Sequence, residues 1–356
     1  MHSYSSEDAV STTSLFQQPS VNDYAALKQR IKGQGLLEKQ PAYYTYKILL
    51  TLMMFIAGLA FLFLIHNFWF QLLNAVYLAV VFAQIGFLGH DIGHRQVFST
   101  LWKSNLVGLL CGDLIIGMSM DWWIEKHNSH HSHPNQTDLD PDLNLPGISF
   151  SKEEAQNRRK LERFIMQHQA MLFFPLLLLV ALDMQRASIS FLVRERGKHR
   201  LIEAGLMLIH FILPVGILLT QLGIWQTVVF VAIHQGVLGL ILGSAFAPNH
   251  KGMPVLEKAS SMDFLRRQVL TARNIKAGRL TDFWYGGLNY QIEHHLFPSM
   301  PRNKLGAAQC LVKNFCRERG ISYEETSVAG SYVAILRNLH EVSTLVRQEE
   351  GHTGAS

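Results

Sequence analysis

Long apolar stretches dominate the pattern of hydrophobic and polar positions. Four of them hold close to the roughly 20 residues that a helix needs to span a bilayer, with no charged residue inside. These stretches are Ile48 to Ile65, Gln71 to Leu88, Ala204 to Leu222 and Ile224 to Pro248. Only residues 66–70 separate the first two and only Gly223 separates the last two, so the sequence predicts two antiparallel membrane hairpins.

Two further apolar stretches are too short to span. Asn105 to Met120 is interrupted by Asp113 and three glycines, and Ala170 to Leu182 has only 13 residues. We expect both to form interfacial, half-inserted helices. The two hairpins return the chain to the side it left, which predicts that residues 89–200 and 251–345 form one helical cap on the cytoplasmic face.

The ends of the chain are polar. Residues 1–40 are expected to form a cytoplasmic tail with a short helix around Val21 to Ile31, without the apolar core of a signal peptide. Residues 346–356 form a second polar tail, and Asn303 to Leu345 has the pattern of two amphipathic helices around a turn at Gly320. Basic residues before the first span favour a cytoplasmic N-terminal end; they are Lys28, Arg30, Lys32, Lys39 and Lys47.

The composition agrees with an all-α integral membrane protein whose membrane domain covers residues 41–345. Charged residues make up 17% of the chain, against roughly 25% in soluble proteins. The formal net charge of +5 fits basic loops beside membrane spans, and no basic motif with interleaved aromatic residues indicates nucleic-acid binding. Cys111, Cys310 and Cys316 form no CxxC pair and predict no disulfide framework.

Histidines gather in clusters beside the predicted spans. His127, His130 and His131 have the i, i+3, i+4 spacing that places three rings on one face of a helix. His90 and His94 are spaced i, i+4 at the end of the second span. The remaining members are Gln291, His294 and His295, which repeat the i, i+3, i+4 spacing, and His250, which directly follows the fourth span.

The predicted topology brings these clusters to one face of the membrane. Neutral imidazole is the commonest metal ligand in proteins, and eight imidazoles suit two metal ions with about four ligands each and open positions for a small reactant. Iron is the expected metal if the protein activates dioxygen, because zinc is redox-inert. Neighbouring carboxylates are expected to hold the N–H groups of the rings; they are Asp91, Asp140, Asp142 and Glu293.

Other polar residues near the clusters are weaker candidates. His66 and His210 are single histidines in apolar surroundings, which is more typical of packed or interfacial side chains. His234, inside the last span, and Asn249 are possible ligands or supporting residues. His133 is expected to be a polar neighbour of the central cluster rather than a ninth ligand.

The three clusters resemble the histidine boxes of the membrane fatty acid desaturases. The matching segments are Gly89 to His94 (GHDIGH), His127 to His131 (HNSHH) and Gln291 to Pro298 (QIEHHLFP). The glutamine that opens the third box, the motif Asp140-Pro141-Asp142 and the segment Phe246 to His250 (FAPNH) are similar to the branch that includes front-end acyl desaturases and their bacterial relatives. The resemblance covers about residues 40–345.

This resemblance implies a diiron centre that uses molecular oxygen to remove hydrogens from adjacent methylenes and leave a cis double bond in a long acyl chain. The chain would be an acyl-CoA or a lipid-linked substrate. Gln291 stands where many relatives have a ligating histidine, and its amide oxygen could bind weakly or through water. The implied iron ligands are His90, His94, His127, His130, His131, His250, His294 and His295.

Many eukaryotic front-end enzymes carry a fused cytochrome b5 domain with a His-Pro-Gly-Gly haem motif, and this sequence contains no such motif. Electrons are therefore expected from an external donor, a ferredoxin-type protein with its reductase. We expect the donor to dock on a basic face that includes Arg266, Arg267, Arg273 and Lys276. The expected location is a bacterial plasma membrane with the active site on the cytoplasmic side.

Two other functions remain open from the sequence. A diiron hydroxylase on the same scaffold would share the first hydrogen abstraction, and the box spacing does not distinguish it. A histidine-rich metal-binding or transport protein would need ionisable residues along its spans, whereas the predicted spans are nearly bare of them. Trp122, Trp123, Trp284 and Tyr285 flank the clusters and fit either an aromatic girdle at the membrane interface or a substrate mouth.

Overall fold

The computed structural model describes residues 23–144, 147–150, 160–195 and 197–353, and this part of the chain is mostly helical. The polar tails predicted at the two ends lie partly outside it, because residues 1–22 and 354–356 are not among the described residues.

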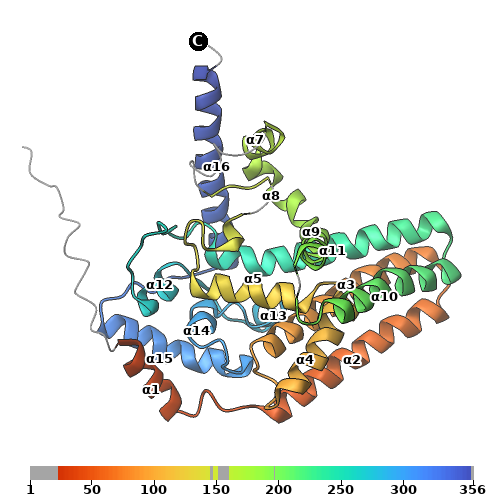
Figure 1. Cartoon of the computed structure of the whole chain (residues 1–356), viewed down its shortest axis with the longest axis horizontal. Coiled ribbons are helices and arrows are strands. Elements are labelled where there is room, and N and C mark those ends of the chain that lie inside the picture. Colours follow the sequence, from red (N-terminus) through yellow and green to blue (C-terminus); the bar gives the residue numbers. More distant parts are fainter. Residues whose placement is uncertain (1–22, 145–146, 151–159, 196, 354–356) are drawn as a thin grey trace, which may run out of the picture.

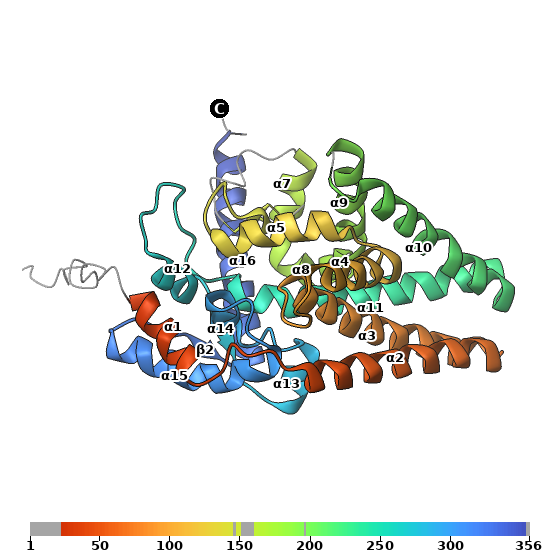
Figure 2. The same ribbon diagram turned by 60° about the horizontal axis from the view of Figure 1, so that its bottom comes forward.

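Four helices are long and apolar enough to cross a membrane. They are α2 (Pro41–Leu64), α3 (Phe68–Gly93), α10 (Arg200–Gln221) and α11 (Ile224–His250), and they cover nearly all of the four predicted stretches. Figures 1 and 2 show these helices running side by side toward one end of the molecule. At the other end α3 and α11 continue past their apolar residues and carry His90 and His250.

The bundle has an inner pair and two outer helices. α3 and α11 pack against each other, while α2 packs on α3 and α10 packs on α11. α2 and α10 expose many leucine, isoleucine and phenylalanine side chains, as lipid-facing helices do. At Gly58 the two helices of the first hairpin approach so closely that a side chain would overlap Leu78, and Asn74 donates a hydrogen bond to the Gly58 carbonyl at 3.1 Å.

Two bent helix pairs correspond to the stretches predicted as interfacial. α4 (Leu101–Leu109) continues into the π-helix η2 (Leu110–Ile116), and the chain then turns by 104° into α5 (Met120–Ser132). α8 (Gln169–Leu177) and α9 (Val180–Arg194) form the second pair, bent by 75°. Counting each bent pair as one broken span would raise the number of crossings from four to six.

Gly117 makes the sharper bend possible. Its φ of +75° lies in the left-handed region that favours glycine. The ring of His210, from α10, lies directly against it, so that any side chain at position 117 would overlap the imidazole. His210 also places Nδ1 3.2 Å from the carbonyl oxygen of Leu114, which explains why a lone histidine sits in that span without belonging to the three clusters.

The cap consists of short helices, four of which share a separate apolar core. Its elements are α1 (Asp23–Gly33), η3 (Pro141–Leu143), α12 (Phe264–Leu270), α13 (Arg279–Trp284), α14 (Gln291–Leu296), η4 (Arg302–Lys304) and α15 (Leu305–Glu318). Leu27, Leu265, Ile292 and Phe315 are fully buried in this core and tie α1, α12, α14 and α15 together. α14 is therefore fixed from several sides.

The last part of the chain connects the cap to the second bent pair. β1 (Asn274–Ile275) and β2 (Glu325–Thr326) form a two-stranded parallel sheet, and β2 follows the turn at Gly320, whose φ is +63°. α16 (Val328–Thr353) then packs against α7 (Lys160–Met166) and α8. Figure 1 shows α16 pointing away from the bundle with the C-terminal end at its tip.

Candidate metal centre

Histidines from four helices converge where the membrane bundle meets the cap. α3 supplies His90 and, one residue beyond its end, His94, while α11 supplies His250 from its last residue. α14 supplies His294 and His295, and the C-terminal half of α5 supplies the remaining three. The structure thus brings together all eight histidines that the sequence indicated as ligands.

The ligand atoms of seven of these histidines fall into two groups, each with its atoms within 4.8 Å of one another. The first group is His90, His94, His127 and His294, and the second group is His130, His250 and His295. His131 lies between the groups, with its ring centroid 4.5 Å from that of His127 and 4.3 Å from that of His295. Such an arrangement has the donor set for two neighbouring metal ions.

In the second group every ring is held from outside the centre. Each Nδ1 faces a hydrogen-bond acceptor, so the proton belongs on Nδ1 and the lone pair of Nε2 points toward the centre. The pairs are His130 with the Asp140 carboxylate (3.0 Å), His250 with the Thr271 carbonyl (3.0 Å) and His295 with the Gln268 side-chain oxygen (2.9 Å). Nε2 of each ring therefore carries no proton and faces the centre, which is the form that binds a metal.

The first group is tied to the cap through a carboxylate and an arginine. His90 Nδ1 lies 3.3 Å from Asp91, and Asp91 pairs with Arg302 at 2.6 Å. The Nε2 atoms of His90 and His294 are buried and have no hydrogen-bond partner among the described residues. A buried polar atom without a partner is costly, and two of them in one cluster of imidazoles fit a site built for a metal ion.

Electrostatics keep most of the rings neutral. Burial is the main cause that lowers the pKa of these imidazoles, and the neighbouring imidazoles lower it further. Histidine must be neutral to bind a metal, so a depressed pKa preserves the ligating form near pH 7. The rings with a pKa well below the ordinary value include His127, His131, His294 and His295.

His130 is different because two carboxylates face it. Burial alone would lower its pKa, but Asp140 and Asp142 outweigh burial and raise it. Asp142 also pairs with Lys126, and this lysine together with His130 holds the pKa of Asp142 below its usual range despite burial. The Asp140-Pro141-Asp142 motif therefore supports His130 on the side that faces away from the centre.

Gln291 and Asn249 lie beside the second group. Gln291 Nε2 is 2.9 Å from His250 Nε2, and its side-chain oxygen accepts a hydrogen bond from Asn249 at 3.1 Å. Asn249 also donates to the Leu288 carbonyl at 3.0 Å. The third box thus presents two histidines and one carboxamide at the centre, and the carboxamide is held in place by Asn249.

The other candidates lie away from the two groups. Glu293 contacts no histidine ring among the described residues; it accepts hydrogen bonds from Asn274 at 2.6 Å and Tyr323 at 2.8 Å. Burial raises the pKa of Glu293 to about 7, against the lowering effect of these two donors. His133 directly follows the last residue of α5 and belongs to neither group, and His234 lies deep in α11, edge-on to the ring of Phe82.

A set of acidic and hydroxyl side chains fixes the start of α5. The first backbone N–H groups of a helix have no partner within the helix. Here three of them are satisfied: Met120 N–H by Asp113 (3.3 Å), Asp121 N–H by Glu203 (2.8 Å) and Trp122 N–H by Ser119 (3.1 Å). Because Glu203 belongs to α10, this contact ties the helix that carries three histidines to the membrane bundle.

Trp123 is a site residue that the sequence left undecided. Its ring stacks on His127 with centroids 4.4 Å apart and an interplanar angle of 22°, and it meets the edge of His90 at 5.5 Å. Trp123 also closes off a small apolar cavity of about 30 Å³ beside His90. This cavity lies along the seam of α3 and α11, where Phe82, Gly86, Leu242 and Phe246 line it.

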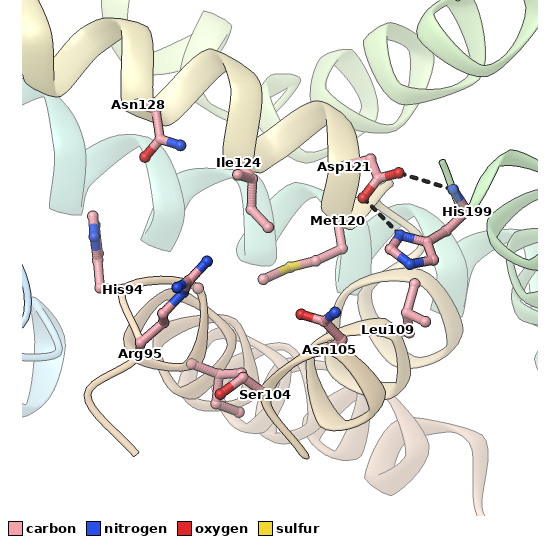
Figure 3. A pocket seen from close by; sticks show the side chains of 12 residues that line it. His94, Arg95, Ser104, Asn105, Leu109, Met120, Asp121, Ile124, Asn128 and His199 are labelled. Carbon is pink, nitrogen blue, oxygen red and sulfur yellow. Dashed lines mark hydrogen bonds and ion pairs between the residues drawn. The ribbon is translucent and has the colours of Figure 1, made fainter. Parts of the chain in front are cut away.

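A larger cavity of about 280 Å³ lies on the other side of the first box. Figure 3 shows it between α5 on one side and α4 with the turn after α3 on the other, with His94 at its edge. Its walls come from residues 92–95, 104–109 and 120–128 together with His199, so the cavity exists only where these segments pack together.

Three of the four basic residues predicted to contact an electron donor instead make hydrogen bonds or ion pairs within the protein. Arg273 is buried and its guanidinium donates to the carbonyls of Pro248 and Lys251. Arg267 donates to backbone carbonyls, one of them that of Ser132, and Arg266 pairs with Asp23 and Asp263. Only Lys276 of this set is exposed, so the predicted docking face needs revision.

Comparison with known proteins gives a consistent result. The family model described as fatty acid desaturase matches residues 67–327. An acyl-lipid (9-3)-desaturase of Physcomitrium patens is 33% identical over 349 residues, which cover 94% of this chain and 65% of that protein. A Delta(5) fatty acid desaturase of Caenorhabditis elegans is 30% identical over 316 residues (84% and 69%), and a Delta(8)-fatty-acid desaturase of Euglena gracilis is 29% identical over 331 residues (89% and 78%).

The chain thus spans slightly less than two thirds of the length of the moss enzyme and more of the other two. The matched region contains all three histidine clusters and His250. This chain belongs to the fatty acid desaturase family.

Proposed function

We propose that the protein is an oxygen-dependent acyl desaturase that introduces a cis double bond into a long acyl chain. The observation that carries this proposal is the convergence of eight histidines next to an apolar cavity at the end of the membrane helices. A methylene offers no acidic proton and no polar handle, so its oxidation needs a redox metal and an apolar channel that fixes its position.

The two histidine groups are the proposed iron sites. The first group would hold one iron and the second group the other, with His131 between them and Gln291 at the edge of the second. Two irons, when bound, would supply the dioxygen-activating redox chemistry that an unactivated methylene requires. The overall reaction removes two hydrogens from adjacent carbons and reduces O2 to two waters with two electrons and two protons from outside.

The residues of the chain perform binding and orientation in this proposal. Asp140, Thr271 and Gln268 hold the rings of the second group, and Asp91 holds His90. The apolar side chains that line the small cavity beside His90, with Trp123 as the wall toward α5, are the proposed contact surface for the methylenes. An acyl chain lying there would pass the first group at a fixed point, which makes the reaction selective for one pair of carbons.

The proposed setting is the bilayer, with both bent helix pairs remaining on the side of the cap and the centre facing the cytoplasm of a bacterial cell. The acyl substrate is a long-chain acyl-CoA or a lipid-linked chain, and the electrons come from an external, ferredoxin-type donor with its reductase. The formal net charge of the chain, +5, suits an acidic partner. Because Arg266, Arg267 and Arg273 are engaged internally, charge reversal at Lys276 is the informative test of the earlier docking prediction.

Expression in a host that lacks the activity, followed by mass spectrometry of its fatty acids, tests the function. We expect new acyl chains lighter by two hydrogens, with a double bond at one mapped position, and their loss in the His250→Ala variant. Products that have instead gained one oxygen would identify the hydroxylase alternative. An unchanged fatty acid profile in several hosts supplied with ferredoxin, reductase and iron would refute the proposal.

A further inference from the structure

Tyr44 is a tyrosine near the start of α2, at the end of this helix that meets the cap, and its side chain is 1% exposed. Its hydroxyl contacts three groups: the side-chain oxygen of Gln96 at 2.7 Å, the carboxylate of Asp91 at 3.2 Å and the backbone N–H of Arg302 at 3.2 Å. A phenolic hydroxyl both donates and accepts, so it accepts from Arg302 and turns its proton toward Gln96 and Asp91. Three contacts to one buried hydroxyl make Tyr44 a junction between segments.

The two side chains that Tyr44 contacts belong to the first box and its continuation. Asp91 lies between the two histidines of that box, and its carboxylate is 3.3 Å from Nδ1 of His90. Gln96 follows the box, and its side-chain amide donates to the carbonyl of Pro298, the last residue of the third box, at 2.8 Å. The Tyr44 hydroxyl therefore lies where α2, the first box and the end of the third box meet.

The first histidine group needs these two boxes at a fixed separation, because it takes His90 and His94 from the first box and His294 from the third. Ligands must keep their positions to within about 0.5 Å for a metal site to hold its geometry. Arg302 adds a second link between the same segments, since its guanidinium donates to the Phe87 carbonyl of α3 at 2.7 Å. Within the described part of the chain, no hydrogen bond of the tyrosine hydroxyl leads to the second group.

We propose that Tyr44 is a positioning residue of the first metal site, which through Asp91 and Gln96 holds the first box against the end of the third. This inference rests on the two-metal centre of the proposed function and extends that centre to α2. Tyr44 lies outside the three boxes and before residues 67–327, the region that the fatty acid desaturase model matches. Among the described residues its hydroxyl bonds to no ligand ring, so its effect on His90 passes through Asp91.

The variant that tests the proposal is Tyr44→Phe, which removes the hydroxyl and keeps the ring that packs edge-on against Tyr43. Tyr77→Phe is the matched control, because its hydroxyl also joins α3 to α2 by donating to the Met54 carbonyl at 2.9 Å. Tyr77 lies about 20 Å along α3 from His90 at 1.5 Å per residue. Both variants lose one tyrosine hydroxyl between the same two helices, so a general effect on stability appears in both.

Ferrous iron affinity is measured on the detergent-purified protein by competition with a chelator, in two backgrounds that each keep one site. His250→Ala removes a ligand of the second group only, and His94→Ala removes a ligand of the first group only. We expect Tyr44→Phe to weaken iron binding in the His250→Ala background by about tenfold, the lower end for a residue that orients a metal ligand. In the His94→Ala background the change should stay within about twofold, as for independent sites. In otherwise wild-type protein, Tyr44→Phe should weaken one of the two irons.

Unchanged affinity for both irons in Tyr44→Phe would overturn the proposal and leave the two-metal centre intact. An equal loss at both sites, or the same loss in Tyr77→Phe, would also overturn it, because the effect would then belong to the fold as a whole. Thermal unfolding of each variant establishes that it is folded. If the wild type itself binds no iron, the two-metal centre of the proposed function fails and the role of Tyr44 fails with it.

Discussion

Asp140→Asn is the substitution that most sharply separates support of the metal centre from general stability. The Asp140 carboxylate is 1% exposed and lies 3.0 Å from His130 Nδ1 through both oxygens. It also accepts the backbone N–H groups of Asn135 at 2.7 Å and Asp142 at 2.9 Å. An asparagine has one acceptor oxygen and one NH2 group in place of two acceptors, so it cannot satisfy all three donors.

The expected loss follows from the kind of hydrogen bond that is removed. A charge-assisted bond in a buried site contributes about 1.5–3 kcal/mol, which corresponds to roughly 10- to 150-fold in affinity. Loss of a carboxylate that orients a metal-binding histidine typically costs about 10- to 100-fold in metal affinity or activity. We therefore expect the second group to lose metal affinity by about one to two orders of magnitude, while the first group is affected much less.

The assay is a competition titration of iron against a chelator of known affinity, read out by elemental analysis of the purified protein. Asp138→Asn is the matched control: Asp138 is exposed, its only ion pair among the described residues is a long one to Lys258 at 3.8 Å, and its φ of +62° suits asparagine equally well. If Asp140→Asn binds metal as tightly as wild type at both sites, the assignment of Asp140 as the support of His130 is refuted.

Two further substitutions test how the first box is held. Arg302→Met should leave the buried Asp91 carboxylate without its partner at 2.6 Å. We expect this to lower the free energy of unfolding by about 3–5 kcal/mol, which denaturant unfolding measures. Adding Asp91→Asn to the same variant should recover part of the loss. Gly93→Ala should force the Trp123 ring to move, which lowers the free energy of unfolding by about 1–3 kcal/mol and reduces activity. Gly205→Ala is the control, because its new methyl meets nothing within 4 Å. We expect that control to be neutral or slightly stabilising in a thermal unfolding assay.

Local features of the chain were predictable from the sequence. The four apolar stretches become helices because their length and composition leave no other way to satisfy the backbone in a bilayer. The spacing of His127, His130 and His131 places their rings on neighbouring turns of α5. Asp140 is one of the four carboxylates expected to hold ring N–H groups, and the structure gives His130 as its partner. These are short-range properties, for which sequence periodicity is a direct guide.

The division of the ligands into two groups was not predictable. His127 and His130 are three residues apart on one helix, yet His127 joins the first group and His130 the second. Which partner each ring meets depends on how α3, α11 and α14 pack around α5, and helix spacing carries no information about that packing. The Thr271 carbonyl that holds His250 is a backbone atom and leaves no mark in the sequence.

The same limit applies to the charged residues. Nothing in the sequence distinguishes Arg273 and Arg302 from surface arginines. In the structure Arg273 donates to buried carbonyls, whereas Arg302 pairs with Asp91. Long-range contacts of this kind, between residues far apart along the chain, decide whether a basic residue is available to a partner. The apolar stretch Asn105 to Met120 likewise predicts a short interfacial helix but not the 104° bend between η2 and α5.

The central claim is that the two histidine groups form a two-metal site that requires residues from all three boxes and His250. The most direct measurement is the number of iron ions per chain in protein purified from iron-supplemented cells. We predict about two for the wild type and about one for His250→Ala, which removes a ligand from the second group only. One zinc per chain, no bound metal, or an iron content unchanged by His250→Ala would contradict the account.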